Sequence, residues 1–115
     1  MIRILLAAIL SLALVTPALA HRVNVFATVA VEEGAEVVLV EVKFSTGRIP
    51  VSGAVTVEDA QGAVVLETEL SEDGTARFPL DREVAGEGLS IVVKTGDGHE
   101  GYWLLTPADL REPAS

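Results

Sequence analysis

Residues 54–80 read AVTVEDAQGAVVLETELSEDGTARFPL, and this stretch decides the fold. It contains three short segments in which apolar and polar residues alternate, the period-two pattern of strands with one buried face. Gln61-Gly62 and Ser71-Glu72-Asp73-Gly74 separate the segments, and their Gly and Asp residues favour tight turns. The sequence therefore predicts strands over residues 54–59, 63–70 and 75–80. Their core-facing side chains are expected to be Val55, Val57, Val64, Leu66, Leu70, Ala76, Phe78 and Leu80.

The same alternation continues on both sides of this stretch and contains no convincing helix. It predicts two earlier strands over residues 21–31 and 37–45 and two later strands over 89–95 and 99–106. The inward side chains of the first strand are expected to be Val23, Val25, Ala27, Val29 and Val31. Strands with one buried face each must form two sheets packed face to face. The predicted fold is an all-β, seven-stranded Greek-key β-sandwich of immunoglobulin or transthyretin-like type.

The first twenty residues have the organisation of a secretory signal peptide. Arg3 supplies a positive charge, residues 4–15 form an apolar segment, and Ala18-Leu19-Ala20 is a small-residue cleavage site. The apolar segment is shorter than the roughly 20 residues that a membrane-spanning helix needs. We therefore expect a cleaved signal peptide over 1–20, a β-sandwich domain over 21–106 and a flexible C-terminal tail over 107–115. The mature protein is expected to be periplasmic or secreted, with no direct insertion into a membrane.

Composition limits the classes of partner and of chemistry. The 115 residues hold 8 Lys and Arg against 17 Asp and Glu, a net charge of −9, which becomes −10 once Arg3 is removed. This charge disfavours nucleic acid and anionic lipid as partners. No cysteine is present, which excludes a thiol nucleophile and disulfides. Neither a nucleophile elbow nor a phosphate-binding or dinucleotide-binding glycine pattern occurs, so we expect a binding protein and not an enzyme.

The two histidines are the residues that point to a ligand. Cleavage after Ala20 makes His21 the first residue of the mature chain, so its α-amine and its imidazole can chelate one metal ion together. The amine has an ordinary pKa of about 7.7–8.0, so a metal ion can displace its proton near neutral pH. His99 adds a third nitrogen. Three nitrogens of this kind suit Cu(II) or Ni(II), which favour square-planar or tetragonal sites.

Whether the two histidines meet depends on the direction of the first and last strands. His21 opens the first strand and His99 opens the last, so parallel strands would place both at one end of the sandwich. Antiparallel strands of 6–8 residues would leave them roughly 20 Å apart. Asp97 and Glu100 flank His99 and are weaker candidates, as oxygen ligands or as groups that orient the imidazole. Their alternative roles are a turn residue between two glycines for Asp97 and a solvent-facing strand residue for Glu100.

Four stretches resemble a known family. They are AHRVNVFA (20–27), FSTGRIPVSGAVTVEDAQG (44–62), EDGTARFPL (72–80) and LSIVVKTGDGHEGYWLL (89–105). They resemble the small exported accessory subunits of energy-coupling-factor-type nickel and cobalt transporters. The central stretches alone resemble carboxypeptidase-regulatory-like domains, which implies the sandwich but no ligand. The more specific parts are the start at His21 and the segment from Gly96 to His99 with Trp103.

The resemblance implies a periplasmic accessory protein for nickel or cobalt uptake. It would bind Ni(II) or Co(II) through His21 and His99, or assist the loading of a membrane permease of a metal uptake transporter. Two alternatives remain open at this point. One is a β-sandwich module without a metal that docks on a membrane protein through an edge strand or the loop from Thr46 to Gly53. The other is a periplasmic copper-binding protein that holds Cu(II) with the same three nitrogens.

Overall fold

The protein is described by a computed structural model, in which the described residues are 22–111. Residues 1–21 and 112–115 lie outside the described residues, and with them the expected signal peptide and His21. The elements are β1 (Val23–Glu32), β2 (Ala35–Phe44), β3 (Gly53–Glu58), β4 (Val64–Glu69), β5 (Thr75–Pro79), β6 (Leu89–Thr95), β7 (Glu100–Leu105) and the short helix α2 (Pro107–Arg111). Within the described range, no helix is long and apolar enough to cross a membrane.

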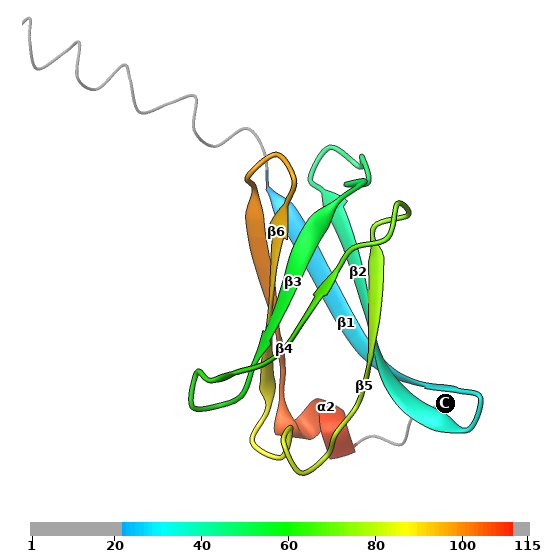
Figure 1. Ribbon diagram of the computed structural model, residues 1–115, viewed down its shortest axis with the longest axis vertical. Coiled ribbons are helices and arrows are strands. Elements are labelled where there is room, and N and C mark those ends of the chain that lie inside the picture. Colours follow the sequence, from blue (N-terminus) through cyan, green and yellow to red (C-terminus); the bar gives the residue numbers. More distant parts are fainter. Residues whose placement is uncertain (1–21, 112–115) are drawn as a thin grey trace, which may run out of the picture.

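The seven strands form two antiparallel sheets packed as a β-sandwich (Figure 1). The first sheet has the strand order β1-β2-β5, and the second has the order β4-β3-β6-β7. The chain therefore changes sheet between β2 and β3, between β4 and β5, and between β5 and β6. These crossovers place β5 beside β2 and β6 beside β3, which gives the Greek-key connectivity expected from the sequence.

Alternating side chains of both sheets fill the space between them. The most deeply buried are Val38, Val40, Val55, Val57, Ile91 and Val93, each no more than 1% exposed. All six lie at period-two positions of their strands. Burial of each side chain of this size contributes roughly 1.5–3 kcal/mol to folding. The period-two pattern therefore predicted the core correctly in these strands.

Two side chains expected in the core are exposed. The register of β3 and β4 shifts between Val57 and Glu58, so Val64 pairs with Glu58 while Leu66 pairs with Val57. This irregularity turns Val64 to the outer face, where it is 56% exposed. Val31 is 44% exposed because the β1–β2 hairpin extends past β5, whose pairing with β2 ends at Val37 (Figure 1). The expected inward positions of Val64 and Val31 were therefore wrong.

The expected flexible tail also differs from the structure over residues 107–111, which form α2 (Figure 1). Thr106 and Asp109 cap the helix reciprocally. The Asp109 amide donates to Thr106 Oγ1 at 3.2 Å, and the Thr106 amide donates to Asp109 Oδ2 at 2.9 Å. Pro107 occupies the first helical position, where its fixed φ is favourable. Leu110 is 7% exposed and joins the core, so the folded domain continues to at least Arg111.

Arg82 ties α2 to the first sheet. Its guanidinium binds both carboxylate oxygens of Glu36 at 2.7 Å, and its Nη1 donates to the carbonyl oxygen of Leu110 at 2.6 Å. The bidentate pair lowers the pKa of Glu36 and raises that of Arg82. A cation at the last carbonyls of a helix also compensates acceptors that have no partner within the helix. The helix therefore closes the end of the sandwich that lies opposite the β6–β7 turn (Figure 1).

Candidate functional site

One end of the sandwich gathers four segments that are distant in the sequence. The start of β1, the β2–β3 loop over 45–52, the β4–β5 turn and the β6–β7 turn all lie at the end opposite α2 (Figure 1). Backbone hydrogen bonds connect them. The Gly96 amide donates to the Ser52 carbonyl at 3.1 Å, and the Val42 amide donates to the Gly74 carbonyl at 2.9 Å. We call this set of segments the turn end of the molecule.

β1 and β7 lie side by side and run in the same direction. A Cβ placed on Gly101 would lie 2.6 Å from the Val23 carbonyl oxygen, so the starts of the two strands almost touch. Further along, the rings of Phe26 and Trp103 are 5.2 Å apart between centroids. Because residue numbers increase in the same direction along both strands from one contact to the next, β1 and β7 are parallel. This is the strand direction that brings the segment after His21 and the segment before β7 to the same end.

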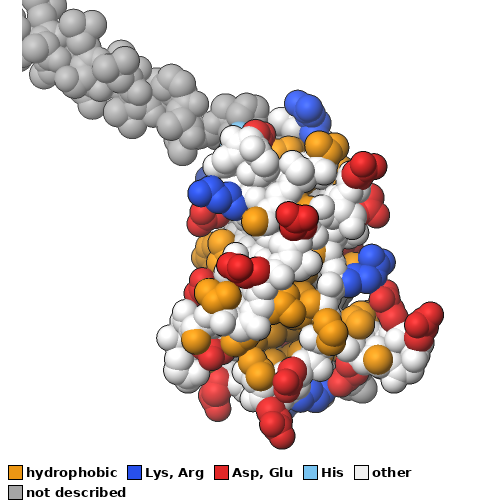
Figure 2. All heavy atoms as spheres, in the orientation of Figure 1, with side chains coloured by type: hydrophobic (Ala, Val, Ile, Leu, Met, Phe, Trp, Pro, Cys, Tyr) orange, Lys and Arg blue, Asp and Glu red, His pale blue; other side chains and the backbone are white. Residues whose placement is uncertain are grey.

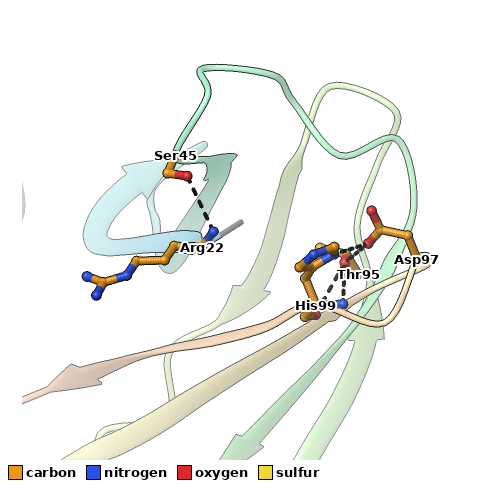
Figure 3. A network of polar contacts seen from close by, with 5 residues as sticks. All are labelled: Arg22, Ser45, Thr95, Asp97 and His99. Atoms are coloured by element: carbon orange, nitrogen blue, oxygen red, sulfur yellow. Dashed lines mark hydrogen bonds and ion pairs between the residues drawn. The ribbon is translucent and has the colours of Figure 1, made fainter. Parts of the chain in front are cut away.

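Arg22, the first residue that the structure describes, is held in place by the end of β2. The Ser45 amide donates to the Arg22 carbonyl at 2.8 Å, and the Arg22 amide donates to Ser45 Oγ at 3.3 Å (Figure 3). The backbone at Arg22 thus continues the β1–β2 ladder by one residue. His21 precedes Arg22 directly in the sequence and lies outside the described residues.

His99 is positioned by a hydrogen-bonded turn, T-G-D-G-H over residues 95–99. The Thr95 amide donates to the His99 carbonyl at 2.7 Å, and the His99 amide donates to Thr95 Oγ1 at 3.1 Å. Gly98, at φ 91°, provides the left-handed residue that the turn needs. Thr95 is only 4% exposed, so this turn is anchored by a buried hydroxyl. The β6–β7 connection is therefore a fixed platform for His99.

Asp97 joins the imidazole to the same hydroxyl. Its Oδ1 lies 2.9 Å from His99 Nδ1 and also accepts a hydrogen bond from Thr95 Oγ1 (Figure 3). These two contacts, with the Thr95 hydroxyl first and the His99 imidazole second, lower the pKa of Asp97 from 3.8 to about 2. The carboxylate is thus ionised at neutral pH and accepts hydrogen bonds only.

The His99 ring lies at the rim of the core. It meets the Phe44 ring edge to face, with 5.6 Å between centroids, and its side chain is 32% exposed. Phe44 pairs in the β1–β2 ladder with Val23, so the residue that His99 contacts is also the strand partner of the first residue of β1. A shallow cavity of about 130 Å³ opens here, lined by Phe44, Thr46, Arg48, Asp97 and His99.

The remaining weak candidate, Glu100, is not part of this arrangement. It is exposed and occupies the first position of β7, opposite Lys94 in the strand pairing. Because successive strand side chains point to opposite faces, it lies on the other side of the strand from His99. Among residues 22–111, no group of three or more His, Asp or Glu side chains is arranged to hold a metal ion.

Three residues of the turn end were not identified from the sequence as part of a site: Thr95, Phe44 and Ser45. Phe44 and Thr95 were assigned to strands only, and Ser45 to a strand end. A signal for Thr95 does exist, because Thr and Asp spaced by two in a Gly-rich turn often bond to nearby backbone and side chains. No local pattern gives the contact of Phe44 with His99, which joins residues 55 positions apart in the chain.

Comparisons with known proteins add little to this geometry. No protein-family model and no curated protein match the chain. Among solved structures, a β-glucuronidase from Ruminococcus gnavus in complex with D-glucaro 1,5-lactone is similar, with 21% identity and a TM-score of 0.49. The match covers 76% of this chain but only 16% of the enzyme. A likeness at this level carries no conclusion about function.

Proposed function

We propose that the mature protein is an extracytoplasmic accessory protein for nickel or cobalt uptake. It binds one divalent ion at the turn end, through the α-amine and imidazole of His21 and the imidazole of His99. It keeps the ion available to a membrane permease. The protein acts by binding, without catalysis. Ni(II) and Co(II) are the cargo in this proposal.

The observation that carries the proposal is the convergence of the segment that follows His21 with the segment that bears His99. Arg22, which follows His21, is hydrogen-bonded to Ser45 at the turn end. His99 contacts Phe44, the residue next to Ser45. Arg22 and His99 thus both contact the end of β2, and this supports a site shared by His21 and His99. The parallel course of β1 and β7, on which the proposed site depends, supports the same proposal.

The chemistry of the donors fits such an ion. Two imidazoles and an amine provide three neutral nitrogens, which suit divalent ions from cobalt to copper. Affinities rise towards copper for almost any site of this kind, so tight copper binding does not identify the cargo. The excess of acidic residues, which are spread over the visible face in Figure 2, also attracts cations to the protein.

A direct test is the affinity of the mature protein for Ni(II) and Co(II) before and after His99→Ala. We expect the variant to bind at least tenfold more weakly, because one of three nitrogens is lost. A matched variant, Thr46→Ala, removes a polar side chain that lines the same cavity and should bind as the unchanged protein does. Equal affinity in His99→Ala would remove His99 from the site.

A second function is supported by a different observation, the exposed apolar side chains. Ile49 and Val51 of the β2–β3 loop are 46% and 70% exposed, and Tyr102 and Leu104 of β7 are 66% and 56% exposed. In Figure 2, hydrophobic side chains also gather on the lower half of the visible face. A docking module without a metal would use such surfaces. This function predicts no metal binding in the titration above.

A further inference from the structure

We infer that Asp97 is a positioning residue, which fixes the proton of His99 on Nδ1 so that Nε2 is the nitrogen offered to a metal ion. This inference rests on the proposed function for its purpose but not for its test. It also chooses between the two roles that the sequence left open for Asp97. In the arrangement described here, Asp97 acts through the imidazole and is not itself a metal ligand.

Asp97 and His99 meet through one pair of side-chain atoms. Asp97 Oδ1 lies 2.9 Å from His99 Nδ1. An Asp carboxyl is ionised near neutral pH and has no proton to donate. A hydrogen bond between these atoms therefore requires the imidazole to carry its proton on Nδ1. In a neutral ring, the lone pair then lies on Nε2.

Asp97 is itself held in place by the buried side chain of Thr95. Its Oδ1 also accepts the hydrogen bond of the Thr95 hydroxyl, and Thr95 is 4% exposed. The same hydroxyl accepts the His99 amide at 3.1 Å. The carboxylate and the histidine backbone are thus fixed by one buried side chain. A metal site gains affinity when ligand orientation is set in advance in this way.

While it is bonded to Nδ1, the Asp97 carboxylate cannot also bind a metal ion held on Nε2. The two ring nitrogens of an imidazole point to different sides of the ring, and a ligated metal ion lies about 2 Å from its nitrogen. A carboxylate oxygen that holds Nδ1 is on the far side from an ion on Nε2. Asp97 therefore orients the ligand, and the further ligands come from elsewhere, which fits the amine and imidazole of His21.

The test begins with the tautomer of His99 in the metal-free mature protein. Ring nitrogens with and without a proton resonate far apart in nitrogen-15 NMR, so long-range correlation spectra at about pH 8, where an ordinary imidazole is neutral, report the tautomer. His99→Ala identifies the His99 signals. We expect the Nδ1–H form in the unchanged protein and a shift towards the Nε2–H form in Asp97→Ala, because that variant removes the oxygen that accepts from Nδ1.

Glu100→Gln is the matched control, because it removes the same charge from the other neighbour of His99 and should leave the tautomer as it is. We expect Asp97→Ala, but not Glu100→Gln, to weaken Ni(II) binding by about tenfold. An Nε2–H form in the unchanged protein, or an Nδ1–H form that persists undiminished in Asp97→Ala, would overturn the inference. If the tautomers behave as expected but no metal binds, the proposed function fails and the role of Asp97 stands.

Discussion

Asp97 shows how a single side chain at the turn end links local structure to stability. The hydroxyl of Thr95 and then the imidazole of His99 lower its pKa from 3.8 to about 2. Because the pKa is lower in the folded protein, the stability that Asp97 contributes is fully present above about pH 4. That contribution is lost as the pH falls through about 2.

The lowered pKa of Asp97 predicts that the stability of Asp97→Asn depends less on pH in the acidic range than that of the unchanged protein. In the unchanged protein, the midpoint of urea unfolding should fall as the pH decreases from about 5 to about 2, partly because Asp97 must take up a proton. The variant lacks this contribution, so its midpoint should fall less over the same range. Asp73, whose pKa is lowered by Thr75, contributes equally to both proteins.

The matched control for this pH series is again Glu100→Gln, in which an exposed carboxylate without a bond to Thr95 or His99 is removed. Its urea midpoints should follow those of the unchanged protein at every pH. If the urea midpoint of Asp97→Asn fell with pH as steeply as those of the unchanged protein and Glu100→Gln, the contact with Thr95 would not lower the pKa of Asp97 in solution.

The residue scale also shows what the sequence could and could not predict about the site. His99 and Asp97 were candidates because few residue types bind metal ions and because they flank one turn. The contribution of Thr95 depends on its burial, and that of Phe44 depends on the pairing of β1 with β2. Both are tertiary properties, so a scan for ligand residues does not find them. His21 lies outside the described residues, and its role stays a prediction.

At the scale of elements, the contact of β1 with β7 depends on a glycine. A Cβ on Gly101 would meet the Val23 backbone oxygen at 2.6 Å and Val25 Cγ2 at 3.2 Å. Backbone cannot move aside as a flexible side chain can. Gly101→Ala should therefore separate the two strands and lower the free energy of unfolding by about 1–3 kcal/mol, the usual cost of overpacking.

Chemical denaturation of Gly101→Ala beside Gly86→Ala checks this prediction. Gly86 has an ordinary backbone conformation, and its nearest neighbour would be 3.6 Å from an added Cβ, so the control should be close to neutral. Gly101→Ala should also weaken metal binding, since it moves the start of β1 away from His99. Equal stability of the two variants would contradict the close approach of β1 and β7.

The capping of α2 gives a second prediction at this scale. Thr106→Ala removes the hydroxyl that accepts the Asp109 amide, and loss of such a cap costs about 1 kcal/mol. Thr106→Ser keeps the hydroxyl and should retain most of the stability. Urea unfolding of both variants measures the difference. If Thr106→Ala were as stable as Thr106→Ser, α2 would not be part of the cooperative fold.

The elements also show where sequence periodicity is sufficient. It predicted all seven strands, because each shows period-two alternation and the first six end at a Gly- or Asp-containing turn or loop. It did not predict α2, because five residues are too few to show a helical period and the residues after Thr106 are rich in proline and charge. It misplaced Val64 and Val31, because a register shift and an overhanging hairpin are relations between strands and leave no trace in either strand alone.

At the scale of the whole molecule, binding at the turn end should stabilise the entire domain. A ligand that binds only the folded protein adds about 2.7 kcal/mol of stability when its concentration is 100 times its dissociation constant. For a domain of this size, that raises Tm by roughly 10 °C or more. Ni(II) should produce this shift in the mature protein, a chelator should reverse it, and His99→Ala should reduce it strongly. A shift of the same size in His99→Ala would place the bound ion elsewhere.

The most direct test of the central claim is a comparison of two mature proteins. One begins at His21, as confirmed by intact mass, and the other carries one additional residue before His21; both are titrated with Ni(II) and Co(II). The extension removes the chelating amine and leaves residues 22–111 unchanged. We predict tight one-to-one binding for the first protein and its loss in the second. Binding that is absent from both, or equal in both, would contradict a metal site built on the N-terminal histidine.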